Sequence, residues 1–254
     1  MFLMKIIDNI LRYYTSFKIK HNQSAYIRFL KKKGIQIGSN FIIRGQLSTI
    51  CIDTSRPSLV SIGDNVTINS YFTLLTHDFV SGIFLNKYQD FIPSSGKTTI
   101  GNNVRFGVKT TVLKGVTIGN NCFIAAGSVV TKSIPANSIA GGIPAKVICN
   151  IDDYYQRRKI ESVNEAFVYA RSIKERYNRE PIATDFWEEF PLFIDASNIE
   201  EYPNIPIKEQ LGDAYNFWLQ NHKAPFKGLE EFLKASYSTQ NSTIEDEKEK
   251  TANH

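Results

Sequence analysis

The fold is decided by the stretch Ile100-Gly-Asn-Asn-Val-Arg-Phe106-Gly-Val-Lys-Thr-Thr-Val112-Leu-Lys-Gly-Val-Thr-Ile118-Gly-Asn-Asn-Cys-Phe-Ile124-Ala-Ala-Gly-Ser-Val-Val130. An apolar residue recurs at every sixth position, and most of these lead residues are followed by glycine or another small or polar residue. A second small or apolar residue stands four positions after each lead residue: Val104, Thr110, Val116, Cys122, Ser128 and Ile134. The pattern therefore has a period of six.

A period of six fits neither an α-helix nor a simple alternating strand. It fits a coil with flat faces, in which each hexad makes one short strand and one turn that glycine and asparagine favour. The same unit begins earlier in the chain, at Ile37-Gly38 and at Ile62-Gly63, and Ile68 and Leu74 continue it. Stacked coils bury their apolar side chains against one another. The sequence predicts a mainly β protein built around a parallel β-helix.

The repeat is interrupted once, between Leu74 and Ile100. Ile100 lies 38 residues after Ile62, which is not a multiple of six, so residues 76–99 are expected to form an inserted loop. The loop begins Thr76-His77-Asp78 and contains polar, aromatic, proline and glycine residues. Long loops on a rigid scaffold often carry functional residues. We therefore look for chemistry at the root of this insertion.

Charge divides the 254-residue chain into parts. Residues 1–33 carry a net charge of +7, residues 34–150 carry +5 and hold thirteen of the fifteen glycines, and residues 151–254 carry −7. We predict an N-terminal helical cap (1–34), a β-helix domain (35–150), a helical C-terminal extension (151–235) and a disordered tail (236–254). The extension is expected to be helical from Asp152 to about Asn178 and again near 207–221, with His222 at the surface.

The N-terminal cap is predicted to contain two helices. Apolar residues repeat at helical spacing over residues 2–17, and a second helix is expected over Ser24–Lys33, ended by Gly34. Such a basic amphipathic helix either caps the next domain or lies on an anionic membrane surface. No apolar run is long enough to span a membrane, and the first residues make a poor secretory signal. Three scattered cysteines form no disulfide framework, which fits a cytoplasmic protein.

The hexads, together with Thr76-His77-Asp78 and Ala140-Gly-Gly-Ile-Pro-Ala-Lys146, resemble the hexapeptide-repeat acyltransferases. The resemblance covers about residues 35–150. It implies a left-handed parallel β-helix, a homotrimer, and acetyl-CoA as the acyl donor. The tail, with Phe186-Trp-Glu-Glu-Phe-Pro-Leu-Phe193, looks like a subgroup that O-acetylates bacterial surface polysaccharides, which implies a carbohydrate acceptor.

Acetyl transfer to a hydroxyl needs a base that accepts the hydroxyl proton, and imidazole suits that role at neutral pH. His77 is the one histidine of the repeat region, and the resemblance implies that it is the general base. Asp78 either orients the imidazole or serves as a loop or substrate residue. Adjacent side chains of an extended segment point in opposite directions, which favours the second role. The resemblance also implies an oxyanion donor from a backbone N–H, for which Gly107 is a candidate.

The pantetheine arm of CoA needs a groove lined by small residues, and its phosphates need cations. We assign the groove to Gly107, Ala125 and Ala126. By the resemblance, Lys132 and Lys146 lie near the nucleotide end, and Ile143-Pro144 is similar to the loop that contacts adenine. Arg105 stands where the family commonly has an aromatic residue, and it either contacts an anionic group or faces solvent. No metal is expected.

Four alternatives remain beside sugar O-acetylation. N-acetylation of a nucleotide-linked amino sugar would use the same fold and donor. A zinc-dependent carbonic anhydrase of this fold would need three histidine ligands, whereas the repeat region has one histidine. A third alternative is a non-enzymatic β-helix scaffold protein. The presence of His77 and of the intact last coil argues against it. Nucleic-acid binding lacks the interleaved basic and aromatic pattern it requires.

Overall fold

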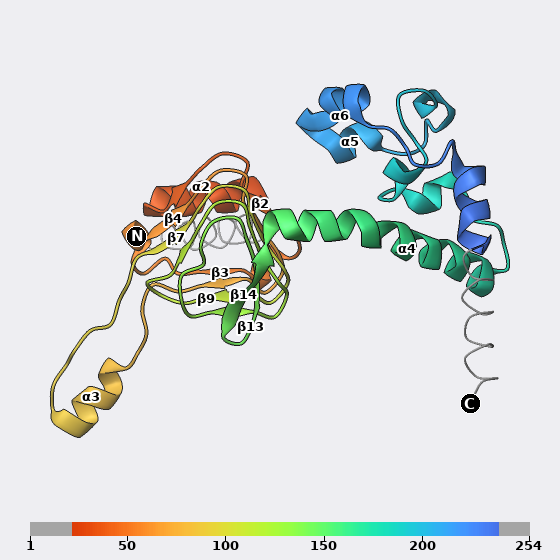
Figure 1. The fold of residues 1–254 in the computed structure, drawn as a ribbon. Coiled ribbons are helices and arrows are strands. Elements are labelled where there is room, and N and C mark those ends of the chain that lie inside the picture. Colours follow the sequence, from red (N-terminus) through yellow and green to blue (C-terminus); the bar gives the residue numbers. More distant parts are fainter. Residues whose placement is uncertain (1–21, 239–254) are drawn as a thin grey trace, which may run out of the picture. The chain divides into compact units, whose positions relative to one another are not determined.

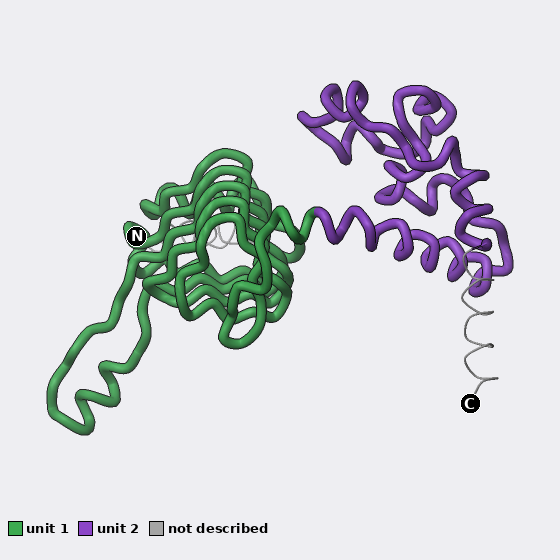
Figure 2. The backbone as a smooth tube through the Cα atoms, viewed as in Figure 1, with its two compact units in different colours: residues 1–155 green, residues 156–254 purple. Residues whose placement is uncertain are grey.

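The computed structural model describes residues 22–238 and divides the chain into two compact units, residues 1–155 and 156–254 (Figure 2). The helix predicted over residues 2–17 lies outside the described residues. No helix within residues 22–238 is both long and apolar enough to cross a membrane.

The first unit is a parallel β-helix with three flat sides (Figure 1). Side A contains β1 (Gln36–Ile37), β4 (Val60–Ile62), β7 (Thr98–Ile100) and β10 (Thr117–Ile118). Side B contains β2 (Ile42–Ile43), β5 (Thr67–Ile68), β8 (Val104–Phe106), β11 (Cys122–Ile124), β13 (Ser138–Gly142) and β14 (Ala145–Asn150). Side C contains β3 (Cys51–Ile52), β6 (Thr73–Leu74), β9 (Thr111–Val112) and β12 (Val129–Val130). All strand pairs are parallel except the closing hairpin of β13 and β14.

The predicted period of six is confirmed by the register and by the core. Ile100 pairs with Ile118, which lies three hexads later, so one coil takes three hexads. All six lead residues from Ile100 to Val130 are at most 1% exposed. The residues four positions after them, from Val104 to Ile134, are buried as well. Each hexad therefore places two side chains inside the prism.

An asparagine ladder forms the corner between sides A and B. Asn40, Asn65, Asn103, Asn121 and Asn137 all have a positive φ of 51° to 59°. The Asn121 amide bridges its neighbours: Asn103 Nδ2 donates to Asn121 Oδ1 (3.0 Å), and Asn121 Nδ2 donates to Asn137 Oδ1 (2.9 Å). Asparagine thus supplies both the left-handed backbone and the cross-coil hydrogen bonds.

We expect Asn121→Ala to lower the free energy of unfolding by about 2 kcal/mol, because alanine at a φ of 55° is strained and both amide hydrogen bonds are lost. Asn121→Gly is the matched control, since it relieves the strain and should cost about half as much. Urea denaturation followed by circular dichroism measures both. Equal losses in the two variants would contradict the role assigned to the backbone conformation.

Helix α2 (Gln23–Lys33) covers the first coil. It is one residue longer than the predicted Ser24–Lys33, and Gly34, with a φ of 103°, ends it as expected. Leu30 is fully buried in the β-helix core, and Tyr26, Ile27 and Phe29 pack against that core. The helix therefore closes the open end of the prism.

The second unit has a separate core rich in aromatic side chains. Its helices include α4 (Ile151–Tyr177), which begins in the first unit, α5 (Ile207–Leu211) and α6 (Tyr215–Asn221), and a further helix runs over residues 229–238. Short 3-10 helices stand at Ala183–Phe186, Phe190–Leu192, Ile199–Glu201 and Gly212–Ala214. The predicted apolar stripe Phe167, Ala170 and Ile173 is buried. It packs in one cluster with Phe186, Phe190, Phe193 and Phe232.

Two expectations for this unit need correction. Residues 236–238 are not a disordered tail: a helix runs over residues 229–238, Ser236 is fully buried, and Arg171 Nη1 donates to its carbonyl (2.6 Å). His222 is half-buried rather than a plain surface residue. It stacks on Trp218 with ring centroids 4.4 Å apart, and its Nε2 lies 2.7 Å from the carbonyl oxygen of Pro191. Both residues therefore help to hold the unit together.

Candidate active site

The candidate site is built at the corner where the chain passes from side C to side A. Strand β3 pairs with β6 so that Ile52 lies beside Leu74. Asp53 directly follows Ile52, and His77 comes three residues after Leu74. The register therefore brings an acid of the first coil next to the histidine of the second.

His77 and Asp53 form a close pair. His77 Nδ1 lies 2.6 Å from Asp53 Oδ2, and the two side chains are 19% and 7% exposed. Asp53 also accepts hydrogen bonds from the Thr76 N–H (3.1 Å) and hydroxyl and from the Ser55 N–H (2.9 Å) and hydroxyl (2.7 Å). Every contact on this carboxylate comes from a donor, so the side chain is fixed.

These donors keep Asp53 ionised. Burial alone would raise the pKa of Asp53, but hydrogen bonds from Thr76, Ser55 and His77 outweigh burial and lower it below its ordinary value of 3.8. An ionised carboxylate 2.6 Å from Nδ1 accepts that nitrogen's proton in a hydrogen bond. The geometry thus assigns the proton to Nδ1 and leaves the lone pair on Nε2.

The Nε2 atom of His77 is open to a substrate. No hydrogen-bond partner is found for it among residues 22–238, and the side chain keeps part of its surface in solvent. The ring of Phe79 stands edge-on to the imidazole, with centroids 5.3 Å apart. A histidine held at Nδ1 and free at Nε2 can accept a proton from an approaching hydroxyl.

Asp78 does not orient the imidazole. Its carboxylate forms an ion pair with Lys114 Nζ (2.6 Å) and accepts a hydrogen bond from the Ser94 hydroxyl (3.1 Å). Lys114 belongs to the next coil, and Ser94 lies on the returning segment of the insertion. Of the two roles left open by the sequence, the structure supports the loop role, in which Asp78 ties the root of the insertion to the β-helix.

Sequence reasoning missed Asp53. The signal that could have found it is the coil register: residues 53–59 interrupt the repeat at the same corner as the larger insertion. The sequence alone does not show that these two interruptions lie at the same corner. The first coil has extra residues within 44–50, so its next lead residue, Ile52, does not follow Ile43 by six. Counting sixes from Ile37 therefore does not reach Ile52.

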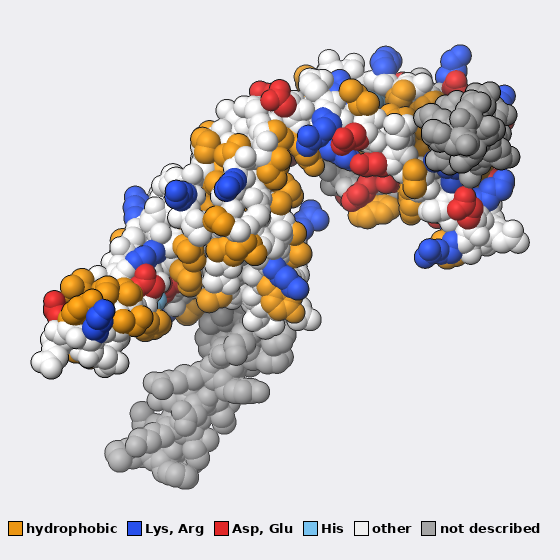
Figure 3. All heavy atoms as spheres, turned by 60° about the horizontal axis from the view of Figure 1, so that its bottom comes forward, with side chains coloured by type: hydrophobic (Ala, Val, Ile, Leu, Met, Phe, Trp, Pro, Cys, Tyr) orange, Lys and Arg blue, Asp and Glu red, His pale blue; other side chains and the backbone are white. Residues whose placement is uncertain are grey.

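The insertion forms an arm that projects from the β-helix (Figures 1 and 2). It carries α3 (Ser81–Tyr88), which the sequence did not predict, and its outgoing and returning segments meet at the root, where Gly96 N–H donates to Thr76 O (2.9 Å). Apolar side chains gather on this arm (Figure 3). The most exposed are Phe79, Ile83, Tyr88 and Phe91, at 61% to 84%.

The predicted CoA groove residues lie along a different corner, where side B passes to side C. Gly107, Ala125 and Ala126 all stand there, after β8 and β11. A Cβ on Gly107 would lie 2.4 Å from the backbone nitrogen of Ala126, so adjacent coils approach closely at this point. The Gly107 N–H donates to Ile124 O (2.8 Å) within the ladder. It is therefore not free to serve as the oxyanion donor that was expected.

The hairpin that ends the β-helix extends the same corner. Gly141 lies over this edge, because a Cβ built on it would stand 2.9 Å from the Ala125 Cβ. The exposed turn Ile143-Pro144 follows, with Lys146 paired opposite Gly141. Lys132 instead follows β12, at the corner that carries His77. Neither lysine has an ion-pair partner among the described residues.

One chain therefore does not bring the candidate base and the small-residue corner together. His77 and Lys132 lie on the edge between sides C and A, whereas Gly107, Ala125, Ala126 and the Ile143-Pro144 turn follow the edge between sides B and C. Arg105 faces outward from side B, where its guanidinium donates to the carbonyl of Asn65 on the neighbouring coil. This contact accounts for Arg105 structurally.

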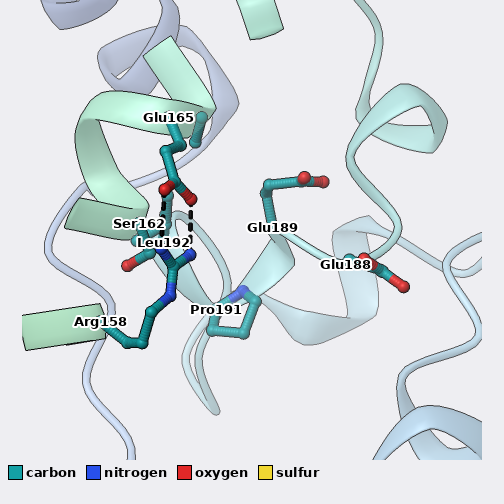
Figure 4. A pocket seen from close by; sticks show the side chains of 8 residues that line it. Arg158, Ser162, Glu165, Glu188, Glu189, Pro191 and Leu192 are labelled. Atoms are coloured by element: carbon teal, nitrogen blue, oxygen red, sulfur yellow. Dashed lines mark hydrogen bonds and ion pairs between the residues drawn. The ribbon is translucent and has the colours of Figure 1, made fainter. Parts of the chain in front are cut away.

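The second unit has a pocket of about 410 Å³ (Figure 4). Arg158 lines it and pairs through both terminal nitrogens with the Glu165 carboxylate, and Glu188 and Glu189 also line it. Burial raises the pKa of Glu189. No histidine is among the residues that line it.

Comparison with known proteins gives consistent matches. The family model described as "Bacterial transferase hexapeptide (six repeats)" matches residues 97–132. Galactoside O-acetyltransferase of Escherichia coli (strain K12) is 40% identical over 141 residues, which cover 54% of this chain and 66% of that protein. Protein CapG of Staphylococcus aureus is 44% identical over 126 residues, covering 49% and 71%.

A solved structure, the maltose O-acetyltransferase from Clostridium difficile 630, is 26% identical, with 55% of this chain and 85% of that chain covered and a TM-score of 0.38. The chain thus spans about two thirds of the length of the first two relatives. Both of those alignments cover about half of the present chain.

Proposed function

Because this chain belongs to the hexapeptide-repeat acyltransferase family, we propose that it is an O-acetyltransferase that moves an acetyl group from acetyl-CoA to a sugar hydroxyl. The acceptor in this proposal is a bacterial surface polysaccharide, such as a capsule or an O-antigen, or its precursor. The proposal also includes a left-handed β-helix. It places the protein in the cytoplasm. The observation that carries it is the His77–Asp53 pair at the root of the arm.

The pair supplies what the first step of acyl transfer needs. Nε2 of His77 accepts the acceptor hydroxyl proton while the oxygen bonds to the thioester carbonyl carbon. The buried carboxylate of Asp53 stabilises the imidazolium that forms and keeps the ring in one orientation. When the carbon–sulfur bond breaks, the imidazolium returns its proton to the CoA sulfur. The products are the acetyl ester and free CoA, and His77 is neutral again.

The corner between sides B and C fits the shape of the acyl donor. Its residues carry no side-chain atom beyond Cβ at Gly107, Ala125 and Ala126, so a thin pantetheine chain can lie against the coils. Lys146 stands near the last coil, where its ammonium is available to a phosphate. Ile143-Pro144 offers an exposed apolar turn to the adenine. These residues would hold CoA at a distance from the His77 of the same chain.

The separation of the two edges supports a homotrimer in which each site lies between copies. In a closed ring of three, the His77 edge of one copy faces the small-residue edge of the next. The exposed apolar arm beside His77 would be covered by such a neighbour. Each trimer then has three equivalent sites, and none is complete within one chain.

Complementation between two inactive variants tests this arrangement. His77→Ala removes the base and Ala126→Trp fills the groove, and each variant alone should be nearly inactive. Isolated mixed trimers should regain about a third of wild-type turnover, because a ring that contains both variants builds one of its three sites from an intact His77 and an intact groove. Co-expression with two affinity tags isolates the mixed species. Mixed trimers no more active than the single variants would contradict a shared site.

The acceptor is tested by incubating the protein with acetyl-CoA and separate sugars while free thiol is measured. We expect release with hydroxyl-bearing glycans, including galactosides, since one relative is a galactoside O-acetyltransferase. N-acetylation of a nucleotide-linked amino sugar is the alternative outcome. Thiol release that requires a free amino group on the acceptor would replace O-acetylation by N-acetylation in this account.

A further inference from the structure

Helix α2 covers the first coil with one face and exposes the other. Its inward face packs on the β-helix: Leu30 is buried in the core, and Gln23 Oε1 accepts the Ile43 N–H of β2 (3.2 Å). Burial and the nearby Cys51 of β3 raise the pKa of Tyr26 to about 12. The opposite face therefore points away from the prism at its N-terminal end.

Three cations make up this outward face, and we call them the cap patch: Arg28, Lys31 and Lys32. Their spacing of three and four residues places them on one stripe of the helix, and all three are exposed. None has an ion-pair partner within the described range 22–238. Residues 22–52 contain five Lys and Arg and no Asp or Glu. Basic residues near the C-terminus of a helix interact favourably with the helix dipole, which gives these cations a structural role as well. That role does not explain why residues 22–52 contain no Asp or Glu.

We propose that the cap patch binds an anionic lipid surface, so that the first unit stands on a membrane with its N-terminal end. Charge complementarity carries this assignment, since unpaired cations on one flat end of a rigid body suit a plane of anionic headgroups. The preceding residues 1–21 add four more Lys and Arg and one Asp to the same end of the sequence. The apolar face of α2 is buried in the core, so attraction to the surface is electrostatic.

Membrane contact would set how far the site lies from the lipid. A helix is about 10 Å wide, and successive coils are about 5 Å apart. His77 follows the second coil, so it would stand roughly 15–20 Å from the surface. This consequence rests on the proposed function: the acetylated sugar would belong to an acceptor held at the membrane. The binding itself does not depend on any activity.

Vesicle flotation of the full chain without acetyl-CoA tests the binding. We expect the protein to float with phosphatidylcholine vesicles containing about 30% phosphatidylglycerol and to stay behind with pure phosphatidylcholine. Replacing the cap patch by Arg28→Gln, Lys31→Gln and Lys32→Gln should weaken partitioning about 100-fold, roughly fivefold per cation. Raising the salt from about 0.1 M to about 0.5 M should release the wild-type protein.

A matched control removes three exposed cations from the second unit by Lys208→Gln, Lys223→Gln and Lys227→Gln. It lowers the net charge equally and should leave partitioning within about twofold of wild type, since none of these three lysines belongs to the cap patch. Equal weakening in both triple variants would overturn the proposal, as would wild-type protein that ignores phosphatidylglycerol. So would a short DNA duplex that binds the cap patch tightly and displaces the vesicles. The cap-patch variant is also assayed for thiol release from acetyl-CoA with soluble acceptors. Unchanged release with weakened vesicle binding would show that the membrane contact and the proposed acetyl transfer can fail independently.

Discussion

Replacing His77 with alanine is expected to reduce acetyl transfer at least about 100-fold while the β-helix stays folded. The reason is local: His77 is the one histidine of the described β-helix, and Asp53 holds its ring so that Nε2 carries the lone pair. The side chain lies at the base of the arm and is partly exposed, so its loss opens no cavity in the main core. Initial rates of thiol release from acetyl-CoA measure the effect.

His222 provides the matched control. It stacks on Trp218 in the second unit, so His222→Ala should lower the stability of that unit and leave turnover within about twofold of wild type. Unchanged circular dichroism of His77→Ala confirms that its loss is chemical. Turnover near the wild-type value in His77→Ala would remove the proposed mechanism.

Asp53→Asn is expected to lower turnover roughly 10- to 100-fold, the second largest effect. The carboxylate accepts a hydrogen bond from the Nδ1–H group, whereas an asparagine amide can turn its NH2 group toward that nitrogen. Nδ1 would then become the acceptor and the proton would move to Nε2, which removes the lone pair that the reaction needs. Asp78→Asn is the control, because Asp78 pairs with Lys114 and not with His77. It should change turnover no more than severalfold.

The lowered pKa of Asp53 also fixes the sign of a pH effect on stability. A carboxyl group whose pKa is lower in the folded state stabilises the protein above its unfolded pKa and stops doing so as the pH falls through the folded value. For Asp53 the stabilisation begins to fall below pH 3.8, the ordinary pKa of an aspartate carboxyl group. We expect urea titrations to show that Asp53→Asn is less stable than wild type at neutral pH and that the difference narrows below pH 3.8. A gap that widens toward acid pH would contradict the ionised carboxylate.

The β-helix could be predicted from the sequence because its period is local and repeated. Six lead residues at a spacing of six specify which side chains point inward, and the structure buries all of them. The insertion at His77 could be found for the same reason, since it breaks a regular count. The length of α4 and its buried stripe follow from helical spacing in the same way.

What the sequence could not supply depends on how coils and corners stack. Asp53 lies 24 residues before His77, and only the pairing of β3 with β6 makes them neighbours. Asp78 is adjacent to His77 in sequence, yet its carboxylate is turned to Lys114. The family resemblance makes Gly107 a candidate oxyanion donor, but its N–H donates to Ile124 O in the ladder between coils. In each case the partner is set by the register of the prism, which a one-dimensional pattern does not contain.

The account's central claim is that Asp53 acts through His77, and a double-mutant cycle tests it most directly. Initial rates of thiol release are compared for wild type, His77→Ala, Asp53→Asn and the double variant under one set of conditions. We predict that the double variant is as slow as His77→Ala alone, because Asp53 has nothing left to orient. A double variant slowed by the full product of the two single effects would show that the residues act independently, which contradicts the account.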